Sequence, residues 1–190
     1  MSAEKFSTSR PGGLILAGGA SSRFGSDKAR AVLNHESETM LDRALDLMTS
    51  LADPVYVVAP ADRDYPNLLE DKYPGQGPFG GLITGLFSLR SPLALVMAVD
   101  QFALSASTLQ RLIEAWRPDT SVVFQAPEEP LQPLPLAIST SLAPALDELW
   151  RGGYRSISRA LDAIGTRTIP PLPGDQLQDA DTRSDLCTGG

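Results

Sequence analysis

The stretch of sequence that decides the fold is GLILAGGASSRFGSDK, residues 13–28. Its first part, Gly13–Leu16, is a short apolar run that stops at Ala-Gly-Gly, which predicts a buried strand ending in a loop. The loop, Ala17–Lys28, is rich in glycine and serine, and glycines let backbone N–H groups turn inward around an anion. Arg23 adds a planar fork of donors and Lys28 a point charge. This pattern predicts a polyphosphate cradle, with an ordinary glycine-rich turn as the alternative; no G-K-[ST] tripeptide follows, so it is not a P-loop.

Outward from this loop, predicted strands and helices alternate. Thr39 is a candidate N-cap for an amphipathic helix through Leu51. The other expected helices end near Arg90 or cover Ser105–Trp116, Leu142–Arg151 and Ile157–Ile164, and the expected strands are Gly13–Leu16, Val55–Ala59, Leu93–Val99, Ser121–Gln125, Leu134–Ser139 and Arg167–Ile169. The alternation predicts an α/β three-layer sandwich with a mostly parallel, Rossmann-like sheet, which binds ligands at the carboxyl ends of its strands. We expect a flexible N-terminal tail over residues 1–12 and a single domain over 13–187.

Two further features are expected at this ligand-binding edge of the sheet. Residues 75–81, GQGPFGG, contain G-x-G-x-x-G, and Asp100 stands 20 residues after the third of those glycines. This spacing is that of the dinucleotide-binding pattern, but that pattern needs an apolar strand before its first glycine, and here the preceding residues are EDKYP. A structural glycine-rich turn is the alternative. Asp100 ends the apolar run Leu93–Val99, where a carboxylate can hold Mg²⁺ against a nucleotide phosphate or can simply cap a turn.

Composition excludes several functional classes. The chain has 16 Lys and Arg against 23 Asp and Glu, a formal net charge of −7, so it lacks the basic footprint of a nucleic-acid binder. The single cysteine, Cys187, and the single histidine, His35, exclude an internal disulfide and a Cys/His zinc site, and no G-x-S-x-G elbow presents a serine. No apolar run approaches the roughly 20 residues of a membrane span, and residues 1–10 carry no apolar signal core. We therefore expect a cytoplasmic protein that binds neither membrane nor nucleic acid.

Taken together, these motifs resemble those of the molybdenum cofactor guanylyltransferases, and more broadly those of nucleotidyltransferases with the sugar-nucleotide-pyrophosphorylase-like, nucleotide-diphospho-sugar transferase type of fold. That family opens with L-A-G-G-x-S-x-R-M-G-x-D-K, which residues 16–28 match with Phe24 in place of Met. Its D-x-x-P-G-x-G-P-L-x-G-L block resembles residues 71–82, which accounts for the apparent dinucleotide pattern. Four later blocks correspond to Asp100 with Leu104, Gln132-Pro133-Leu134, residues 153–156 and residues 179–186. The resemblance spans about residues 13–187.

The resemblance implies nucleotidyl transfer from GTP to the terminal phosphate of molybdenum-bearing molybdopterin, with release of pyrophosphate. Catalysis of such a transfer is mainly alignment and neutralisation of charge. By this resemblance Arg23, Lys28 and Asp100 are catalytic, and Asp100 holds Mg²⁺. The implied nucleotide-binding residues are Leu16, Ala17, Gly18, Gly19, Lys28, Asp71, Gly77, Gly80, Gly81 and Asp100. The acceptor is expected near residues 132–136 and Arg155, and contacts with cofactor-biosynthesis proteins or molybdoenzymes are also implied.

The chain departs from the family pattern at three places. Gln101 and Phe102 stand where the family has a hydrophobic residue and Pro, Ala59-Pro60 stands where it often has a base-contacting Asn, and Asp replaces both Asn at 179 and 181. The LAGG sequence favours guanine, because cytidylyl members typically have L-A-A-G, whereas the closing Asp pair resembles the cytidylyl side. The alternatives are therefore a molybdopterin cytidylyltransferase, a sugar-phosphate nucleotidyltransferase, or a non-catalytic nucleotide-binding regulator.

Overall fold

The computed structural model describes residues 10–18, 28–32, 38–101, 103–173, 175 and 177, with Lys28 described by its backbone alone. Its strands are β1 (Gly12–Leu16), β2 (Val55–Ala59), β3 (Leu68–Glu70), β4 (Leu93–Ala98), β5 (Ser121–Phe124), β6 (Leu136–Ser139) and β7 (Arg167–Ile169). Its α-helices are α1 (Met40–Leu51), α2 (Pro78–Ser88), α3 (Ala106–Ala115), α4 (Ala143–Arg151) and α5 (Ile157–Ala163), with 3-10 turns η1 (Lys28–Arg30) and η2 (Thr140–Leu142). The predicted elements are thus confirmed to within a few residues at their ends.

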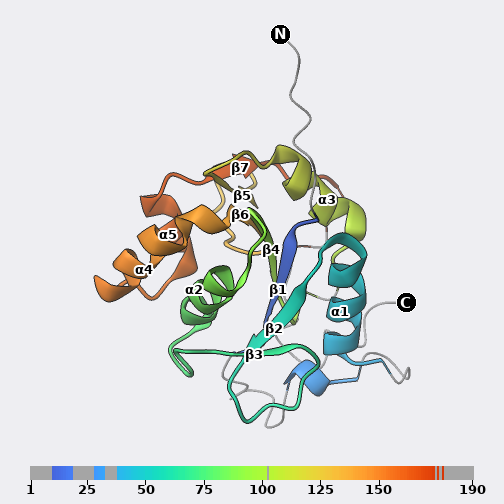
Figure 1. The fold of residues 1–190 in the computed structure, drawn as a ribbon. Helices are drawn as coiled ribbons and strands as arrows, with labels where there is room; N and C mark the ends of the chain where they lie inside the picture. Colours follow the sequence, from blue (N-terminus) through green and yellow to red (C-terminus); the bar gives the residue numbers. More distant parts are fainter. Residues whose placement is uncertain are drawn as a thin grey trace.

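These strands form one sheet in the order β3-β2-β1-β4-β6-β5-β7, with helices on both faces (Figure 1). Neighbouring strands are parallel, except that β6 is antiparallel to both β4 and β5. The predicted three-layer, mostly parallel α/β sandwich is therefore confirmed. Sequence analysis missed β3, because this strand has only three residues and lies half-exposed at the sheet edge, where no apolar pattern marks it.

The sheet separates two apolar cores, because successive side chains of a strand point to opposite faces. Ile15 of β1 packs into the core beneath α1 and α3, whereas Leu14 and Leu16 pack into the core beneath α2, α4 and α5. Gly85 lets α2 approach this second face closely: a Cβ atom there would lie 2.5 Å from Cδ1 of Leu14. Within the described ranges, no helix is long and apolar enough to cross a membrane.

A capping box starts α1, as the sequence predicts for Thr39. The N–H of Asp42 donates to Oγ1 of Thr39 at 3.1 Å, and the Thr39 N–H donates to Oδ2 of Asp42 at 2.9 Å. These two bonds satisfy backbone donors at the first turn that the helix itself leaves unpaired. The Thr39 hydroxyl also donates to Oδ2 of Asp42 at 2.7 Å, and this bond together with the one from the Thr39 N–H holds the pKa of the Asp42 carboxyl below its ordinary value.

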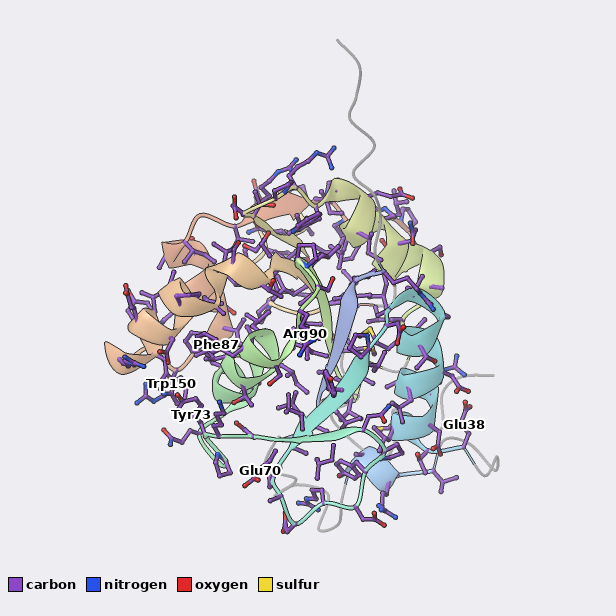
Figure 2. All side chains as sticks on the ribbon, in the orientation of Figure 1. Glu38, Glu70, Tyr73, Phe87, Arg90 and Trp150 are labelled. Atoms are coloured by element: carbon purple, nitrogen blue, oxygen red, sulfur yellow. The ribbon has the colours of Figure 1, made fainter. Side chains whose placement is uncertain are left out.

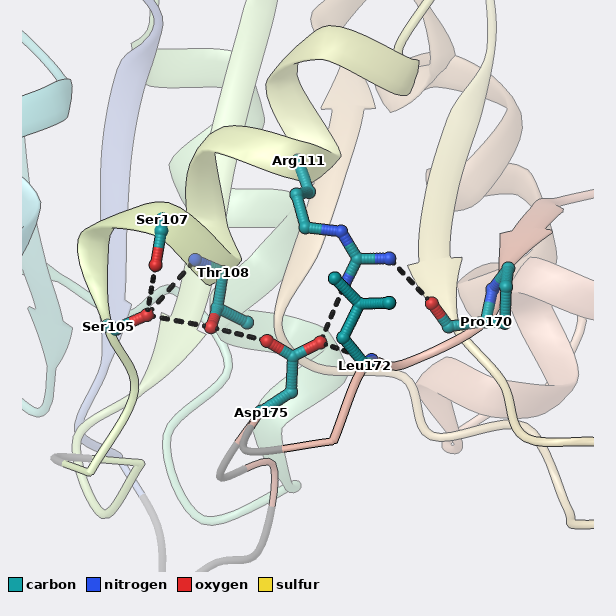
Figure 3. A network of polar contacts seen from close by, with 7 residues as sticks. All are labelled: Ser105, Ser107, Thr108, Arg111, Pro170, Leu172 and Asp175. Atoms are coloured by element: carbon teal, nitrogen blue, oxygen red, sulfur yellow. Dashed lines mark hydrogen bonds and ion pairs between the residues drawn. The ribbon is translucent and has the colours of Figure 1, made fainter.

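The segment after β7 crosses α3 and is fastened there by a polar cluster, the Asp175 clamp (Thr108, Arg111, Leu172 and Asp175; Figure 3). Asp175 accepts hydrogen bonds from the Thr108 hydroxyl at 2.7 Å, the Arg111 guanidinium at 2.5 Å and the Leu172 N–H at 2.7 Å. Burial raises the pKa of Asp175, but these bonds and the Arg111 charge outweigh it and hold the pKa below its ordinary value. The clamp thus holds the segment that follows β7 against α3.

Candidate active site

The carboxyl ends of β1, β2 and β4 lie side by side, and predicted site residues follow them. Hydrogen bonds continue the sheet past the strands: Ala17 N–H donates to the carbonyl of Val58 at 2.9 Å, and Val99 N–H donates to the carbonyl of Leu16 at 3.2 Å. Asp100 comes directly after Val99 and therefore lies beside the start of the loop that follows β1. The structure thus places the predicted residues on either side of the β1–β4 boundary at one sheet edge, where α/β folds bind ligands.

Asp71 joins this edge to helix α2. Its N–H donates to the last carbonyl of β2 at 2.8 Å, and its carboxylate is buried, with the whole residue 5% exposed. Oδ1 accepts a hydrogen bond from the Tyr73 N–H at 2.9 Å and lies 3.4 Å from the Thr84 hydroxyl. Oδ2 faces two predicted nucleotide-binding glycines: added Cβ atoms would lie 3.6 Å away at Gly18 and 3.7 Å away at Gly81. One carboxylate therefore lies against both glycine-containing segments.

The glycine segment, residues 75–81, forms a turn that leads into α2. Gly75 has φ of 75° and Gly77 has φ of 91°, conformations that favour glycine, and no atom lies within 4 Å of a Cβ added at either position. Gly77 is the N-cap of α2, and Pro78 is the first helical residue. Gly80 packs on Tyr73, where an added Cβ atom would lie 2.6 Å from the tyrosine Cβ. No strand leads directly into Gly75, so the segment is the glycine-rich turn and not a strand–turn–helix dinucleotide site.

Asp100 lies in the turn that ends β4. The N–H of Gln101 donates to the carbonyl of Ala98 at 3.2 Å, which closes this turn, and Oδ1 of Asp100 is buried. Within the described ranges, no cluster of three or more His, Cys, Asp or Glu side chains could hold a metal ion. Mg²⁺ commonly takes one or two protein carboxylates and completes its shell with phosphate oxygens and water, so the donor set at this edge suits that ion.

Of the two predicted cations, Lys28 opens η1, whereas Arg23 lies outside the described residues, as does Gly19. The turn at Lys28 is anchored at its centre and at its last residue, because Ala29 is buried and the Arg30 guanidinium donates to the carbonyl of Asp64 and lies 5.9 Å from the Tyr65 ring. The backbone of Lys28 is therefore fixed against the segment between β2 and β3 (lower end of Figure 1).

A cluster of aromatic rings, which sequence analysis missed, packs against the glycine segment. Tyr73 and Trp150 lie together at the outer layer (Figure 2), with ring centroids 4.9 Å apart, and Phe79 meets Trp150 at 5.6 Å. The Arg155 guanidinium lies 4.1 Å from the Trp150 ring and donates to the Trp150 carbonyl at 2.9 Å. Arg155, expected near the acceptor, is thus engaged in packing at the end of α4. In the sequence, the apolar face of α4, which carries Trp150, is the feature that could have predicted this cluster.

Comparisons with known proteins agree with this geometry. A family model described as the MobA-like NTP transferase domain matches residues 13–164. A protein of Chloroflexus aggregans named "Probable molybdenum cofactor guanylyltransferase" is 32% identical over 159 residues, which cover 80% of this chain and 76% of that protein.

Two solved structures share the fold. Molybdopterin-guanine dinucleotide biosynthesis protein A from Archaeoglobus fulgidus has a TM-score of 0.69 and 19% identity, covering 84% of this chain and 83% of that one. The 2-C-methyl-D-erythritol 4-phosphate cytidylyltransferase from Thermus thermophilus has a TM-score of 0.71 and 18% identity, covering 92% of this chain and 95% of that one. Because the two names differ in the base that is transferred, the fold alone does not determine the base.

The sheet order, the residues gathered at its edge and these matches define the class of the protein, which is a nucleotidyltransferase. Within that class, the chain belongs to the MobA-like NTP transferase family.

Proposed function

We propose that this protein transfers GMP from GTP to the terminal phosphate of molybdenum-bearing molybdopterin, forming molybdopterin guanine dinucleotide and pyrophosphate. The observation that carries the proposal is that Asp71 lies against two glycine-containing segments at the carboxyl edge of the sheet, while Asp100 follows β4, the strand beside β1, at the same edge. The name of the Chloroflexus relative and the LAGG sequence at residues 16–19 support guanine and this acceptor.

The proposed step is an in-line displacement. An oxygen of the acceptor phosphate attacks the α-phosphorus of GTP and forms the new P–O bond. The bond from that phosphorus to the oxygen bridging the α- and β-phosphates breaks, and its electron pair leaves with pyrophosphate. No general base is needed, because the attacking phosphate is already ionised. The protein then contributes alignment and charge stabilisation.

Each proposed residue has one task in that step. Backbone N–H groups from Leu16 to Ser21 hold the nucleotide, and Arg23 and Lys28 stabilise charge on the phosphates, including the leaving pyrophosphate. Asp100 would hold Mg²⁺, which when bound neutralises phosphate charge. Asp71 helps fix the nucleotide or the metal through Oδ2.

Gly77 lets the base approach the backbone closely, since its φ of 91° excludes most side chains and the space beside it is open. Gly80 and Gly81 support this approach indirectly, because their lack of a side chain lets α2 pack on Tyr73 and beside Asp71.

Pyrophosphate release separates this proposal from its alternatives. Wild-type protein is supplied with Mg²⁺, the molybdenum-bearing acceptor and GTP, CTP or UTP in turn, and pyrophosphate is measured. A second series replaces that acceptor with a sugar phosphate. GTP is expected to be consumed fastest. A preference for CTP would instead indicate a cytidylyltransferase, and turnover only with a sugar phosphate acceptor would indicate that class.

A binding arm tests for the non-catalytic regulator. A ligand at about 100 times its dissociation constant stabilises a protein by roughly 2.7 kcal/mol, so GTP with Mg²⁺ should raise the melting temperature by several degrees while NAD leaves it unchanged. Stabilisation by GTP without pyrophosphate release from any triphosphate would favour the regulator.

A further inference from the structure

Gln101 stands where the family has a hydrophobic residue, yet its side chain is deeply buried, at 2% exposure. Its Oε1 accepts a hydrogen bond from the Ala98 N–H at 3.1 Å, and its Nε2 donates to the Leu134 carbonyl at 3.0 Å. One buried amide thus uses its acceptor and its donor on two different segments. An apolar residue can make neither bond, so the departure from the family pattern creates a contact of its own.

The pairing of β4 with β6 shows what this amide replaces. At the far end of the pair, Thr140 N–H donates to the Pro92 carbonyl at 3.1 Å, and in an antiparallel ladder every second pair from there is hydrogen-bonded. Continuing the register, Ala98 and Leu134 would be such a pair. The Gln101 amide instead bridges the Ala98 N–H and the Leu134 carbonyl. The amide therefore holds the segments of Ala98 and Leu134 apart where β4 ends.

The two segments that Gln101 joins belong to different parts of the proposed site. Ala98 begins the turn that carries Asp100, and Gln101 is itself fixed in that turn, since its N–H donates to the Ala98 carbonyl and its carbonyl accepts from the Leu104 N–H, both at 3.2 Å. Leu134 lies in the acceptor segment, residues 132–136. The Gln101 amide therefore couples the position of the Asp100 turn to that of the acceptor segment.

We propose that Gln101 is a positioning residue that holds the acceptor segment open beside Asp100 and so sets the access of the acceptor phosphate to the nucleotide. This inference rests on the proposed nucleotidyl transfer. It concerns access of the acceptor and leaves the binding of the triphosphate to the glycine segments and cations unchanged.

The test measures the steady-state kinetics of Gln101→Met at one pH, with the acceptor and GTP varied in turn. Methionine keeps the volume of the buried side chain but can neither accept from the Ala98 N–H nor donate to the Leu134 carbonyl. The acceptor KM of this variant is expected to rise on the order of tenfold, the scale of a lost buried hydrogen bond. The KM for GTP should stay at the wild-type value, because the proposed triphosphate contacts lie on the glycine segments and cations.

Two further variants control for packing and for the substitution itself. Gln101→Asn keeps an amide on a side chain one methylene shorter, which cannot reach Ala98 and Leu134 together, so its acceptor KM should also rise. Gln110 of α3 carries the matched change, because its amide donates to the Glu114 carboxylate at 3.3 Å on the helix surface. Gln110→Met should keep the wild-type ratio of acceptor KM to GTP KM.

The outcomes distinguish the two levels of inference. A wild-type protein that releases no pyrophosphate from any triphosphate refutes the proposed function, and the role of Gln101 with it. An active wild type with an unchanged acceptor KM in Gln101→Met overturns the role of Gln101 alone. An equal rise in the acceptor KM and the GTP KM also overturns it, because a general loosening of the site would affect both substrates. If Gln101→Met does not fold, the same two KM values of Gln101→Asn still decide.

Discussion

The nucleotide half of the molecule (residues 12–98) and its C-terminal half (residues 106–177) reach the same sheet edge by different means. In the nucleotide half every strand pair is parallel, and glycines, caps and backbone hydrogen bonds between neighbouring elements shape most of the edge. Its side-chain contacts there, those of Arg30 with Asp64 and of Asp71 with Tyr73 and Thr84, span 34 residues or fewer. In the C-terminal half, side chains join distant segments: Asp175 binds α3 across 64 to 67 residues, and Trp116 Nε1 donates to Oγ of Ser139 at 3.0 Å.

This difference predicts which substitutions should lower the reaction rate and which should lower the stability of the fold. A backbone-built edge tolerates loss of a single polar side chain without unfolding, so such losses should appear in the reaction. A side-chain clamp holds two segments together, so its loss should appear first in stability. The predictions below test this division, beginning with the largest expected effect.

Asp100→Asn should give the largest effect on the reaction. The change keeps the size and one carbonyl oxygen but removes the negative charge that Mg²⁺ prefers. Pyrophosphate release should fall by roughly 10²- to 10³-fold, the scale of a lost electrostatic stabiliser, and half-activation should need more Mg²⁺. Stability should change by no more than about 1 kcal/mol. A Mg²⁺ titration of the initial rate measures the effect.

The matched control is Asp46→Asn, because Asp46 is an exposed aspartate of α1. It should keep the wild-type rate and Mg²⁺ dependence. Identical Mg²⁺ curves for Asp100→Asn and wild type would remove Asp100 from the site and leave it as a turn residue.

Lys28→Ala should rank second, with turnover lowered by about 10²-fold and the melting curve kept within about 0.5 kcal/mol of wild type. The backbone of η1 is anchored by Ala29 and Arg30, so removing this side chain should leave the turn in place. Lys28→Arg should recover part of the rate because it keeps the charge. Arg90→Ala, an exposed cation beyond the C-terminal end of α2, serves as the control. A fully active Lys28→Ala protein would indicate a glycine-rich turn with solvated cations.

The same division explains what the sequence could predict. The β1 run, the Thr39 cap and the glycine turns are local patterns of a few residues, so they were predicted with near-correct bounds. Strand β3 was missed because three half-exposed residues at an edge carry no periodicity.

The side-chain contacts of the C-terminal half could not be predicted in the same way. Nothing near Asp175 in the sequence marks Thr108 and Arg111 as its partners, since only the fold brings them together. Gln101 was recognised as a departure from the family, but its bond to Leu134 depends on the β4–β6 register.

Asp175→Asn should destabilise the protein by about 1–3 kcal/mol, as expected when a buried acceptor of three hydrogen bonds loses its charge. The midpoint of urea unfolding near neutral pH measures this cost. Because the native contacts hold the pKa of Asp175 below its ordinary 3.8, folding favours the ionised form. Its contribution is complete above the unfolded pKa and is lost as pH falls through the lower folded pKa.

The difference in stability between wild type and Asp175→Asn should therefore be constant from about pH 7 to 5 and shrink below the ordinary value of 3.8. A difference that stays constant down to about pH 3 would contradict an ionised clamp.

The smallest effect, and the sharpest test of the comparison, concerns two helix caps. Thr39 caps α1 together with Asp42 of the same helix, whereas Ser105 caps α3 and also meets the Thr108 hydroxyl at 2.8 Å, which in turn donates to Asp175. Either Thr39→Ala or Ser105→Ala should cost about 1 kcal/mol in the wild type.

Repeating both substitutions in the Asp175→Asn background separates a local cap from a cap that belongs to the clamp. Urea unfolding should show that the cost of Thr39→Ala adds to that of Asp175→Asn within about 0.5 kcal/mol, because the two sites share no partner. The cost of Ser105→Ala should instead differ between the backgrounds by more than about 0.5 kcal/mol, because the Ser105 hydroxyl reaches Asp175 through Thr108. Additivity at both caps would mean that the C-terminal half is held by independent local contacts, as the nucleotide half is.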